Sequence, residues 1–366
     1  MNDIGNLAHA GDPYWVDVLP AGEFLGLADK TVLHSGPPIE YARMCPLHKR
    51  CMVNACYMEG WAKSESEAVA LLERGEVACE AAFDYATNGS GIGIITKSVP
   101  LLIVEDRAWN SRAGLFPAEG KFGGGFCGWG VYSEDIAANL KWMREELFSE
   151  LMKVVQDAGG FPMKALLDEA LRMGDELHSS QRAIDPLFTR AIIPYCLKCR
   201  NAADLLDYFA TTGRFTHNFG QAASRALVLG LEKAGKRGFL TAAGGNGVEY
   251  GIKVAGSDKW YTAPSPMIVG PYLTPGAKKE NQLSWIGDSS IVECRGWGGQ
   301  LYPINPDFER RREGAAETFP ARPAPQTEGR IINGGMMDVN GGWMGAGSTR
   351  MPAACFAQAR EDGAAC

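Results

Sequence analysis

The stretch Pro162-Met-Lys-Ala-Leu-Leu-Asp-Glu-Ala-Leu-Arg-Met-Gly-Asp-Glu-Leu-His178 lies inside a region whose residue pattern predicts helix almost throughout. Five helical segments are expected there, at residues 134–153, 162–177, 185–195, 202–210 and 218–233. Strands mixed with helices are expected on both sides. The sequence therefore predicts an α+β (mixed α/β) fold in three parts: an α/β N-terminal domain over residues 1–132, a helical domain over 133–236 and an α+β C-terminal domain over 237–366.

The two flanking regions contain recognisable strand and helix patterns. Before the helical region, strands are expected at 15–19, 31–34 and 99–104, and helices at 46–63 and 65–74. Ser64 followed by Glu67 is the pattern of a capping box at the start of the second helix. Beyond Gly238, strands are expected at 248–254, 259–262 and 289–293, separated by turns rich in proline and glycine.

Composition and charge narrow the class of protein. The chain has 366 residues, 46% hydrophobic and 22% charged, which is typical of a folded protein with two or three domains. A net charge of −7 argues against nucleic acid as a partner, because nucleic acid requires a basic face. The N-terminus lacks the pattern of a signal peptide, and no apolar run is long enough to cross a membrane. We expect a cytoplasmic protein that binds neither nucleic acid nor membrane.

Ten cysteines leave two alternatives. They include two groupings: Cys45, Cys51 and Cys56 near His48, and Cys196 with Cys199. A structural zinc site needs four ligands, which the two groupings together could supply. Free thiols in apolar helices are the favoured alternative, because unpaired cysteine is a common small core residue. We therefore assign no metal ligand and no cofactor, and a divalent metal stays an open alternative.

The end of the opening stretch holds the first candidate site. Asp175, Glu176 and His178 fall within four residues. On a helix, Asp175 and His178 would share one face, and a carboxylate beside an imidazole can orient the ring and tune its pKa toward neutrality. Such an imidazole can transfer protons or bind a metal. The alternative is a solvated helical surface with an incidental histidine.

Glycine-rich segments supply further candidates, since 45 glycines exceed the usual share of about 7%. Gly244-Gly-Asn-Gly-Val-Glu-Tyr-Gly251 places Asn246 in a tight loop and Glu249 on the strand that follows, an arrangement suited to a carboxamide or ureide ligand. Asp288 is expected in a turn before a strand, where it either bonds its own backbone or points into a cleft. An ordinary hairpin and an ordinary turn are the structural alternatives.

Basic residues and hydroxyls form the last candidates. Ser348-Thr349-Arg350 combines two hydroxyl donors with a charged fork, which is the type of group that holds phosphate. Asn88-Gly-Ser-Gly-Ile-Gly93, with Lys97 beyond it, offers a backbone nest for a small oxyanion but lacks the order of a dinucleotide-binding motif. Arg43 and Lys121 have no special spacing and are more typical of a surface.

Taken in order, these segments resemble the YlbE-like family, a large subunit of the bacterial oxamate carbamoyltransferase system. The segments that carry the resemblance are Ser35-Gly-Pro-Pro38, Arg43-Met-Cys-Pro46, Tyr57-Met-Glu-Gly-Trp-Ala62, Ser98-Val-Pro-Leu-Leu-Ile-Val-Glu105, Leu140-Lys-Trp-Met-Arg144, Met173-Gly-Asp-Glu-Leu-His178, Asn246-Gly-Val-Glu-Tyr-Gly251, Trp260-Tyr-Thr-Ala-Pro264, Ile286-Gly-Asp-Ser-Ser-Ile-Val-Glu293 and Gly345-Ala-Gly347. Each is short, but their common order is specific. The resemblance implies the same three-part fold.

The chain departs from that family's pattern in three places. Members usually continue the histidine motif as His-Asn-Arg-Asn, where this chain has His178-Ser-Ser-Gln-Arg182. A loop of the type Asn-Glu-Gly-Leu-Gly is replaced by Phe122-Gly-Gly-Gly-Phe126, and the segment between Gly299 and Gly334 is shorter. A substrate other than oxalurate is therefore left open.

The resemblance implies transfer of a carbamoyl group between a ureide such as oxalurate and phosphate, in purine and allantoin degradation. On that basis His178 is expected to act as general acid and base, with Asp175 or Glu176 orienting its ring. Asn246 and Glu249 would hold the amide edge of the substrate. The anion-binding candidates are Arg350 with Ser348, because carbamoyl-phosphate transferases use a Ser-Thr-Arg type of motif at a helix N-terminus, and Arg43; Asp288 is expected to orient another group or bind a metal.

Two alternatives compete with this enzyme hypothesis. The chain would be a non-catalytic scaffold subunit of a multi-protein transferase if its partners carried the chemistry, with the arginine-rich segment 309–313 as a docking surface. A hydrolase acting on an amide or ureide is the third hypothesis. The expected ligands are a ureide, oxamate and carbamoyl phosphate, and the expected partners are other transferase subunits and further copies of this chain.

Overall fold

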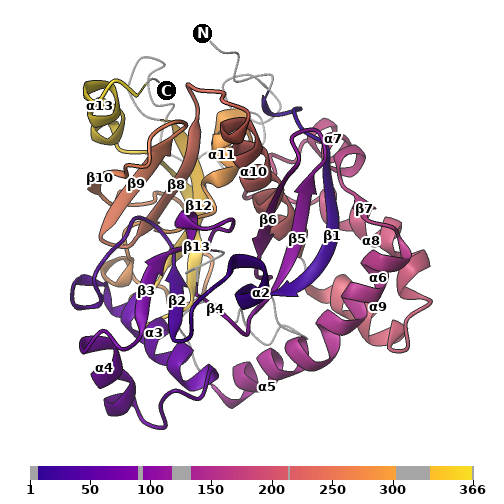
Figure 1. Cartoon of the computed structure of the whole chain (residues 1–366), viewed down its shortest axis with the longest axis horizontal. Coiled ribbons are helices and arrows are strands. Elements are labelled where there is room, and N and C mark those ends of the chain that lie inside the picture. Colours follow the sequence, from indigo (N-terminus) through magenta and orange to yellow (C-terminus); the bar gives the residue numbers. More distant parts are fainter. Residues whose placement is uncertain (1–6, 90–93, 118–132, 213–214, 302–329, 365–366) are drawn as a thin grey trace.

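An antiparallel sheet of four strands forms the centre of the N-terminal part (Figure 1). The computed structural model describes residues 7–89, 94–117, 133–212, 215–301 and 330–364. The strand order is β6-β5-β1-β7, with β1 (Pro13–Pro20), β5 (Pro100–Asp106), β6 (Ser111–Leu115) and β7 (Phe161–Pro162). The apolar run of β5 is buried on both faces, which confirms the strand predicted at 99–104.

A smaller sheet carries the first two long helices. β2 (Thr31–His34) pairs in parallel with β3 (Ala78–Ala81) and antiparallel with β4 (Ile95–Thr96). Because parallel neighbours need a long crossover, α3 (Pro46–Met58) and α4 (Glu65–Glu73) lie between β2 and β3 in the chain. The predicted cap of α4 is confirmed, since Oγ of Ser64 accepts a hydrogen bond from the Glu67 backbone N–H at 3.2 Å.

The predicted helical region is confirmed, and α6 and α10 pack against the N-terminal sheet. The helices are α5 (Glu134–Trp142), the π-helical turn η4 (Met143–Leu147), α6 (Phe148–Asp157), α7 (Lys164–Arg172), α8 (Ile184–Cys196), α9 (Ala202–Thr212) and α10 (Phe215–Lys233). α10 is buried along most of its length, between the N-terminal sheet and the C-terminal strands (Figure 1). It therefore serves both halves of the fold as a shared packing surface.

The helix predicted over residues 162–177 is shorter in the structure. α7 stops at Arg172, and the chain then turns through Gly174 (φ +95°) and Leu177 (φ +62°). Both values lie in the left-handed region, which an α-helix does not use. Asp175 and His178 therefore lie in a tight turn before α8, and the expectation that they share one helix face was wrong.

The C-terminal part contains two sheets. The first has the order β10-β9-β8-β11, with β8 (Leu240–Asn246), β9 (Glu249–Val254), β10 (Tyr261–Pro264) and β11 (Ile286–Gly287). The second is the ladder of β12 (Ile331–Met337) with β13 (Trp343–Arg350). The strand predicted at 248–254 is confirmed, but the one predicted at 289–293 was wrong, because that segment forms the short helix α11 (Ile291–Cys294).

The remaining elements are short: α2 (Ala21–Leu25), η1 (Tyr41–Arg43), η2 (Ala82–Asp84), η5 (Lys279–Asn281), η6 (Gly298–Leu301) and α13 (Ala353–Glu361). Among the described helices, none combines the length and apolarity that a membrane span requires. The fold is thus a mixed α+β fold, as predicted.

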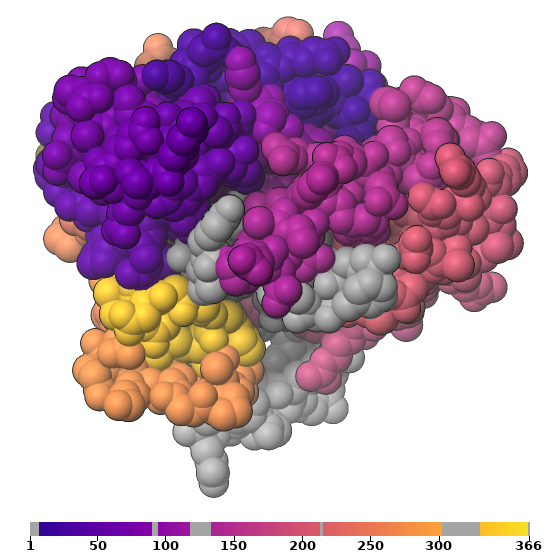
Figure 2. All heavy atoms as spheres, turned by 90° about the horizontal axis from the view of Figure 1, so that it is seen from below, coloured from indigo at the N-terminus to yellow at the C-terminus, as the bar shows by residue number. Residues whose placement is uncertain are grey.

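One apolar core joins the three parts of the chain. It contains residues from each, such as Leu102 of β5, Leu151 of α6 and Ile252 of β9. Viewed from below, the C-terminal strands (yellow) lie directly beside the N-terminal α3–α4 region (purple), with α5 and α6 on the other flank (Figure 2). The division at residues 132 and 236 stays a prediction, and the three parts pack as one body around the candidate site.

Candidate active site

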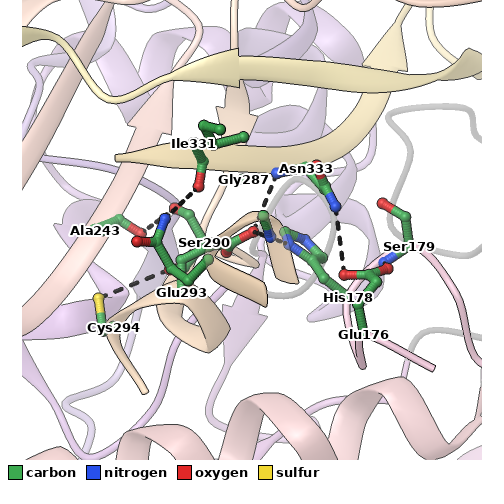
Figure 3. A network of polar contacts seen from close by, with 12 residues as sticks. Glu176, His178, Ser179, Ala243, Gly287, Ser290, Glu293, Cys294, Ile331 and Asn333 are labelled. Carbon is green, nitrogen blue, oxygen red and sulfur yellow. Dashed lines mark hydrogen bonds and ion pairs between the residues drawn. The ribbon is translucent and has the colours of Figure 1, made fainter. Parts of the chain in front are cut away.

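The pair His178–Glu293 is the centre of a buried polar network (Figure 3). Nδ1 of His178 lies 2.7 Å from Oε1 of Glu293, and both side chains are buried. The histidine comes from the turn before α8 and the glutamate from α11. Backbone contact joins these segments, since the Gly298 N–H donates to the Glu176 carbonyl at 2.7 Å. Two stretches 115 residues apart in sequence thus form one site.

Glu293 has two oxygens in different surroundings. Oε1 accepts hydrogen bonds from the backbone N–H groups of Asn333 (3.0 Å) and Gly299 (3.3 Å), so it faces His178 as an acceptor and Nδ1 carries the proton. Oε2 is buried and has no hydrogen-bond partner among the described residues. Gly298 leaves the space that the carboxylate needs, because a Cβ there would lie 2.3 Å from Oε1. This environment fixes the tautomer and the orientation of the ring.

Glu176 lies on the other side of the same histidine (Figure 3). Its Oε1 accepts hydrogen bonds from the backbone N–H groups of Ser179 and Ser180, and its Oε2 accepts one from Nδ2 of Asn333 at 3.3 Å. Burial outweighs these donors and the nearby His178, and it raises the pKa of Glu176 to about 7. Asn333 on β12 therefore links both carboxyl groups, through its side chain to Glu176 and through its backbone to Glu293.

A second imidazole stacks on the first. The rings of His178 and His217 are nearly parallel, at 12°, with centroids 5.6 Å apart. Nε2 of Gln181 lies 2.6 Å from Nδ1 of His217 and 3.1 Å from the His178 carbonyl oxygen. Trp285 packs edge-on against His178, with centroids 6.5 Å apart. The site thus holds two imidazoles, two carboxyls and two amides in contact.

The carboxylate of Asp175 holds the start of α8. Its Oδ2 accepts hydrogen bonds from the backbone N–H groups of Ala183 and Ile184, both at 2.8 Å, and its Oδ1 accepts one from Oγ of Ser180. These donors stand at the start of α8, where backbone N–H groups lack helical partners. The carboxylate that lies on Nδ1 of His178 is that of Glu293, so the geometry favours Glu293 over Asp175 as the orienting group.

Asp288 and Asn246 are brought together around the loop after β2. Oδ1 of Asp288 accepts from the Gly36 N–H (2.7 Å) and Oδ2 from the Gly89 N–H (2.8 Å). Nδ2 of Asn246 donates to the Pro37 carbonyl at 3.0 Å, while its Oδ1 accepts from the backbone of the hairpin that follows. Burial raises the pKa of Asp288 to about 8 despite its two donors. Both side chains hold backbone, and Asn246 ends strand β8 where a loop was predicted.

The remaining predicted residues lie outside the His178 network. Nη2 of Arg43, an exposed side chain, forms an ion pair with Oε1 of the partly buried Glu249 at 3.3 Å. Ser348 and Arg350 lie in β13, paired with Asn333 and Ile331 of β12. The Ser-Thr-Arg segment therefore lies in a strand and not at a helix N-terminus. Burial lowers the pKa of Arg350.

Four residues of the network were missed by sequence reasoning: Gln181, His217, Glu293 and Asn333. Glu293 closes a segment that carries the family resemblance, and Gln181 lies where the chain departs from the family's pattern, so each had a weak signal in the sequence. Asn333 and His217 had none, because their roles depend on contacts far along the chain. Lys121, the segment Phe122–Phe126, the arginine-rich segment 309–313 and residues 90–93 of the glycine-rich nest lie outside the described residues.

Among the residues that the structure describes, no three His, Cys, Asp or Glu side chains lie close enough together to hold a metal ion. Cys45, Cys51 and Cys56 pack in the smaller core cluster, whereas Cys196 lies in the main one. Burial raises the pKa of Cys56 to about 11 and that of Cys196 to about 12, so both stay protonated thiols at neutral pH.

Fold and site together define an α+β protein with a buried imidazole–carboxylate centre. The chain belongs to the family described as oxamate carbamoyltransferase subunit AllG, whose match covers residues 77–289. The Escherichia coli (strain K12) protein of that description is 30% identical over 393 residues, which cover 95% of this chain and 93% of the relative. A second relative from the same strain, the uncharacterized protein YahG, is 28% identical over 282 residues, or 75% of this chain and 58% of that protein.

The fold also has a solved relative. A crystal structure of a conserved protein of unknown function from Enterococcus faecalis V583 matches with a TM-score of 0.81 and 21% identity, covering 98% of this chain and 95% of that one. This likeness concerns the fold alone. The predicted link to the oxamate carbamoyltransferase system is confirmed at the level of the family, under the name AllG in place of YlbE-like.

Proposed function

We propose that this chain is a subunit of a carbamoyltransferase that moves a carbamoyl group between phosphate and a small amide of the oxamate type. Membership of the AllG family supports the reaction class. The observation that carries the proposal is the buried contact between His178 and Glu293, because carbamoyl transfer needs a group that delivers a proton to nitrogen.

The proposed chemistry uses the imidazole as a general acid and base. In phosphorolysis of a ureide, a phosphate oxygen forms a bond to the carbamoyl carbon and the carbon–nitrogen bond breaks. The electron pair goes to the leaving nitrogen, and Nε2 of His178 supplies the proton that makes it a neutral amide. In the reverse direction His178 removes that proton as the amide nitrogen attacks carbamoyl phosphate. Glu293 on Nδ1 stabilises the imidazolium form in both directions.

The other residues that were predicted to bind the ligand have separate proposed roles. Glu176, whose pKa is raised to about 7 by burial, can be neutral or charged near neutral pH. Arg43 and Arg350 remain the proposed anion partners, and Ser348 and Glu249 their neighbours on β13 and β9. Asn246 and Asp288 are proposed to act by shaping the loop after β2.

A scaffold role is the second candidate, because the E. coli relative is named as a subunit and His178 is buried in this chain. In that case the network would stabilise the fold and partners would supply the chemistry. Further transferase subunits are the partners that we propose in either case.

A phosphate-release assay tests both candidates. The full chain is mixed with carbamoyl phosphate and a panel of acceptors that includes oxamate, with and without the proteins that co-purify with it. Oxamate-dependent phosphate release, lost in His178→Gln, is the expected result. Release only with partners, and unchanged in His178→Gln, would assign the scaffold role. Breakdown of a ureide such as oxalurate that does not depend on phosphate would indicate a hydrolase.

A further inference from the structure

Segment 267–273 adds an extended stretch to the free edge of β13. Val269 pairs with Ser348, and Tyr272 pairs with Gly345, so the segment runs antiparallel to the strand in one register. The Val269 N–H donates to the Ser348 carbonyl at 3.1 Å, and the Ser348 N–H donates to the Val269 carbonyl at 3.0 Å. Figure 2 shows this part of the chain (orange) at the surface, directly beside the yellow strands. The segment is therefore fixed on the C-terminal ladder.

The outward side chains of this segment form an apolar face of Met267, Val269 and Leu273. Alternate residues of a strand point to the same side, which places these three together. Their exposed fractions are 45%, 51% and 57%, whereas Ile268 between them is buried. Among the described residues, four of the eight exposed large hydrophobic side chains belong to segment 267–273, so the exposure is concentrated here. A strand with one side in water usually carries polar residues there, and an apolar one marks a surface that another molecule covers.

Charged residues are almost absent from this part of the chain. No Asp, Glu, Lys or Arg occurs in residues 260–277, although charged residues make up 22% of the whole sequence. Residues 331–349, which supply most of the neighbouring ladder, contain only Asp338. The carboxyl group of Asp338 accepts hydrogen bonds from the backbone N–H of Asn340 at 2.7 Å and from Nδ2 of Asn281 at 3.2 Å. Such a depletion of charge is typical of the core of a protein interface.

We propose that the apolar face binds the same face of a second copy of this chain. In a twofold contact each residue near the axis meets its own counterpart, so a charged residue there would meet an equal charge. An uncharged face avoids that repulsion, which matters for two chains that each carry a net charge of −7. A different protein is usually selected by complementary charges, and this face has none to offer. Contacts between identical subunits are also more apolar than those between different proteins.

The proposed contact is connected to the buried centre by one row of cross-strand neighbours. Ser348, the partner of Val269, pairs on its other side with Asn333 of β12. Asn333 bonds both carboxyl groups of the centre, with its backbone N–H to Glu293 and its side chain to Glu176. A second copy that covers Val269 would therefore restrain the strands that present Asn333. The contact itself concerns assembly and does not depend on the proposed reaction.

Analytical ultracentrifugation of the full chain tests the contact. We expect the wild type to sediment as a dimer, with twice the 39.5 kDa of one chain. Leu273→Lys should raise the Kd of the dimer at least about 30-fold, the usual effect of losing a central interface residue. Met267→Lys, at the other end of the apolar face, should act in the same direction. The matched control is Leu197→Lys, because this leucine is 63% exposed at the end of α8 and lies outside the apolar face; it should leave the Kd unchanged.

Circular dichroism and thermal unfolding of each variant confirm that the fold is intact. A wild type that stays monomeric at ~100 µM, well above the Kd of a stable interface, would overturn the inference. A dimer whose Kd is the same in Leu273→Lys, Met267→Lys and Leu197→Lys would place the contact elsewhere, with the same consequence. If the chain alone is monomeric and a co-purified subunit binds the wild type but not Leu273→Lys, the apolar face belongs to that subunit and not to a second copy.

Discussion

Glu293 combines an oxygen surrounded by donors with a buried oxygen that has no hydrogen-bond partner among the described residues. If its charge stabilises the imidazolium form of His178, removing that charge while keeping the acceptor should affect turnover more than folding. We expect Glu293→Gln to lower carbamoyl transfer by about 100-fold, within the usual range for general acid–base catalysis. Steady-state assays with matched circular dichroism spectra check this result.

Glu105 supplies the control for that substitution, since it forms an ion pair with Arg112 at 3.2 Å between two strands, away from the histidines. Glu105→Gln should leave turnover within about twofold, because ion pairs of this kind contribute little. Equal turnover in the wild type and in Glu293→Gln would assign Glu293 a purely structural role.

Glu176 predicts a pH dependence of stability. Its pKa is about 7 in the folded state and 4.5 as the ordinary value, so the folded state holds the proton more tightly. The free energy of unfolding should therefore fall as pH rises from about 4.5 to about 7, by roughly 3 kcal/mol, and stay level above. The side chain of Glu176→Gln cannot ionise, so the free energy of unfolding of this variant should not fall over that pH range. Asn333 can still bond the new side chain, because its amide group can donate or accept. Urea unfolding of both proteins from pH 4.5 to 8 measures the difference; parallel curves would contradict the prediction.

At the scale of elements, the local sequence pattern correctly predicted the features that depend on residues close together in the chain. The buried apolar run of β5, the cap at Ser64 and the alternation in β9 were all correct. Each depends on neighbours in sequence, such as the N–H of Glu67 three residues after its cap. Element type could therefore be predicted for most of the fold.

The errors arose where distant contacts override local preference. Ile291 and Val292 favour a strand by β-branching, yet they form a helical turn because Oγ of Ser290 donates to the Ala243 carbonyl and fixes the segment against β8. Gly244 and Gly245 are typical of a loop, but they lie in strand β8. Because these two glycines have no side chains, they leave room for Asp288 and Trp285. The candidate site was predictable only in part, since His178 and Glu176 were identified and their partner Glu293 was not.

Gly36 belongs to the loop after β2 and offers an element-scale prediction. It has φ +77°, and a Cβ there would lie 2.4 Å from the backbone nitrogen of Asn246. Gly26 has a similar φ of +70° with nothing within 4 Å, so it isolates the cost of the backbone conformation. We expect Gly26→Ala to cost about 1–2 kcal/mol and Gly36→Ala at least ~2 kcal/mol more. Urea unfolding measures both, and equal costs would show that the loop moves freely from β8.

At the scale of the whole molecule, the shared core bears on the three-part division. Leu151 and Leu227 of the helical part are buried in the same core cluster as Leu102 and Ile103 of β5. The isolated segment 133–236 would expose these surfaces to water, which costs about 25 cal/mol for each Å² of apolar area. We therefore expect that segment to lack the near-UV signals of fixed aromatic packing that the full chain shows. A cooperative thermal transition of the isolated segment would instead support an independent helical domain.

The carboxyl group of Asp288 accepts hydrogen bonds from Gly36 and Gly89, which lie 252 and 199 residues earlier in the chain. During synthesis on the ribosome, the loop after β2 leaves the exit tunnel long before Asp288 does. His178 is likewise synthesised before its partner Glu293, and Glu293 is synthesised before its partner Asn333. The nascent chain therefore holds an incomplete centre until Asn333 has been translated, and a product that ends before Asn333 would lack the backbone N–H that bonds Glu293.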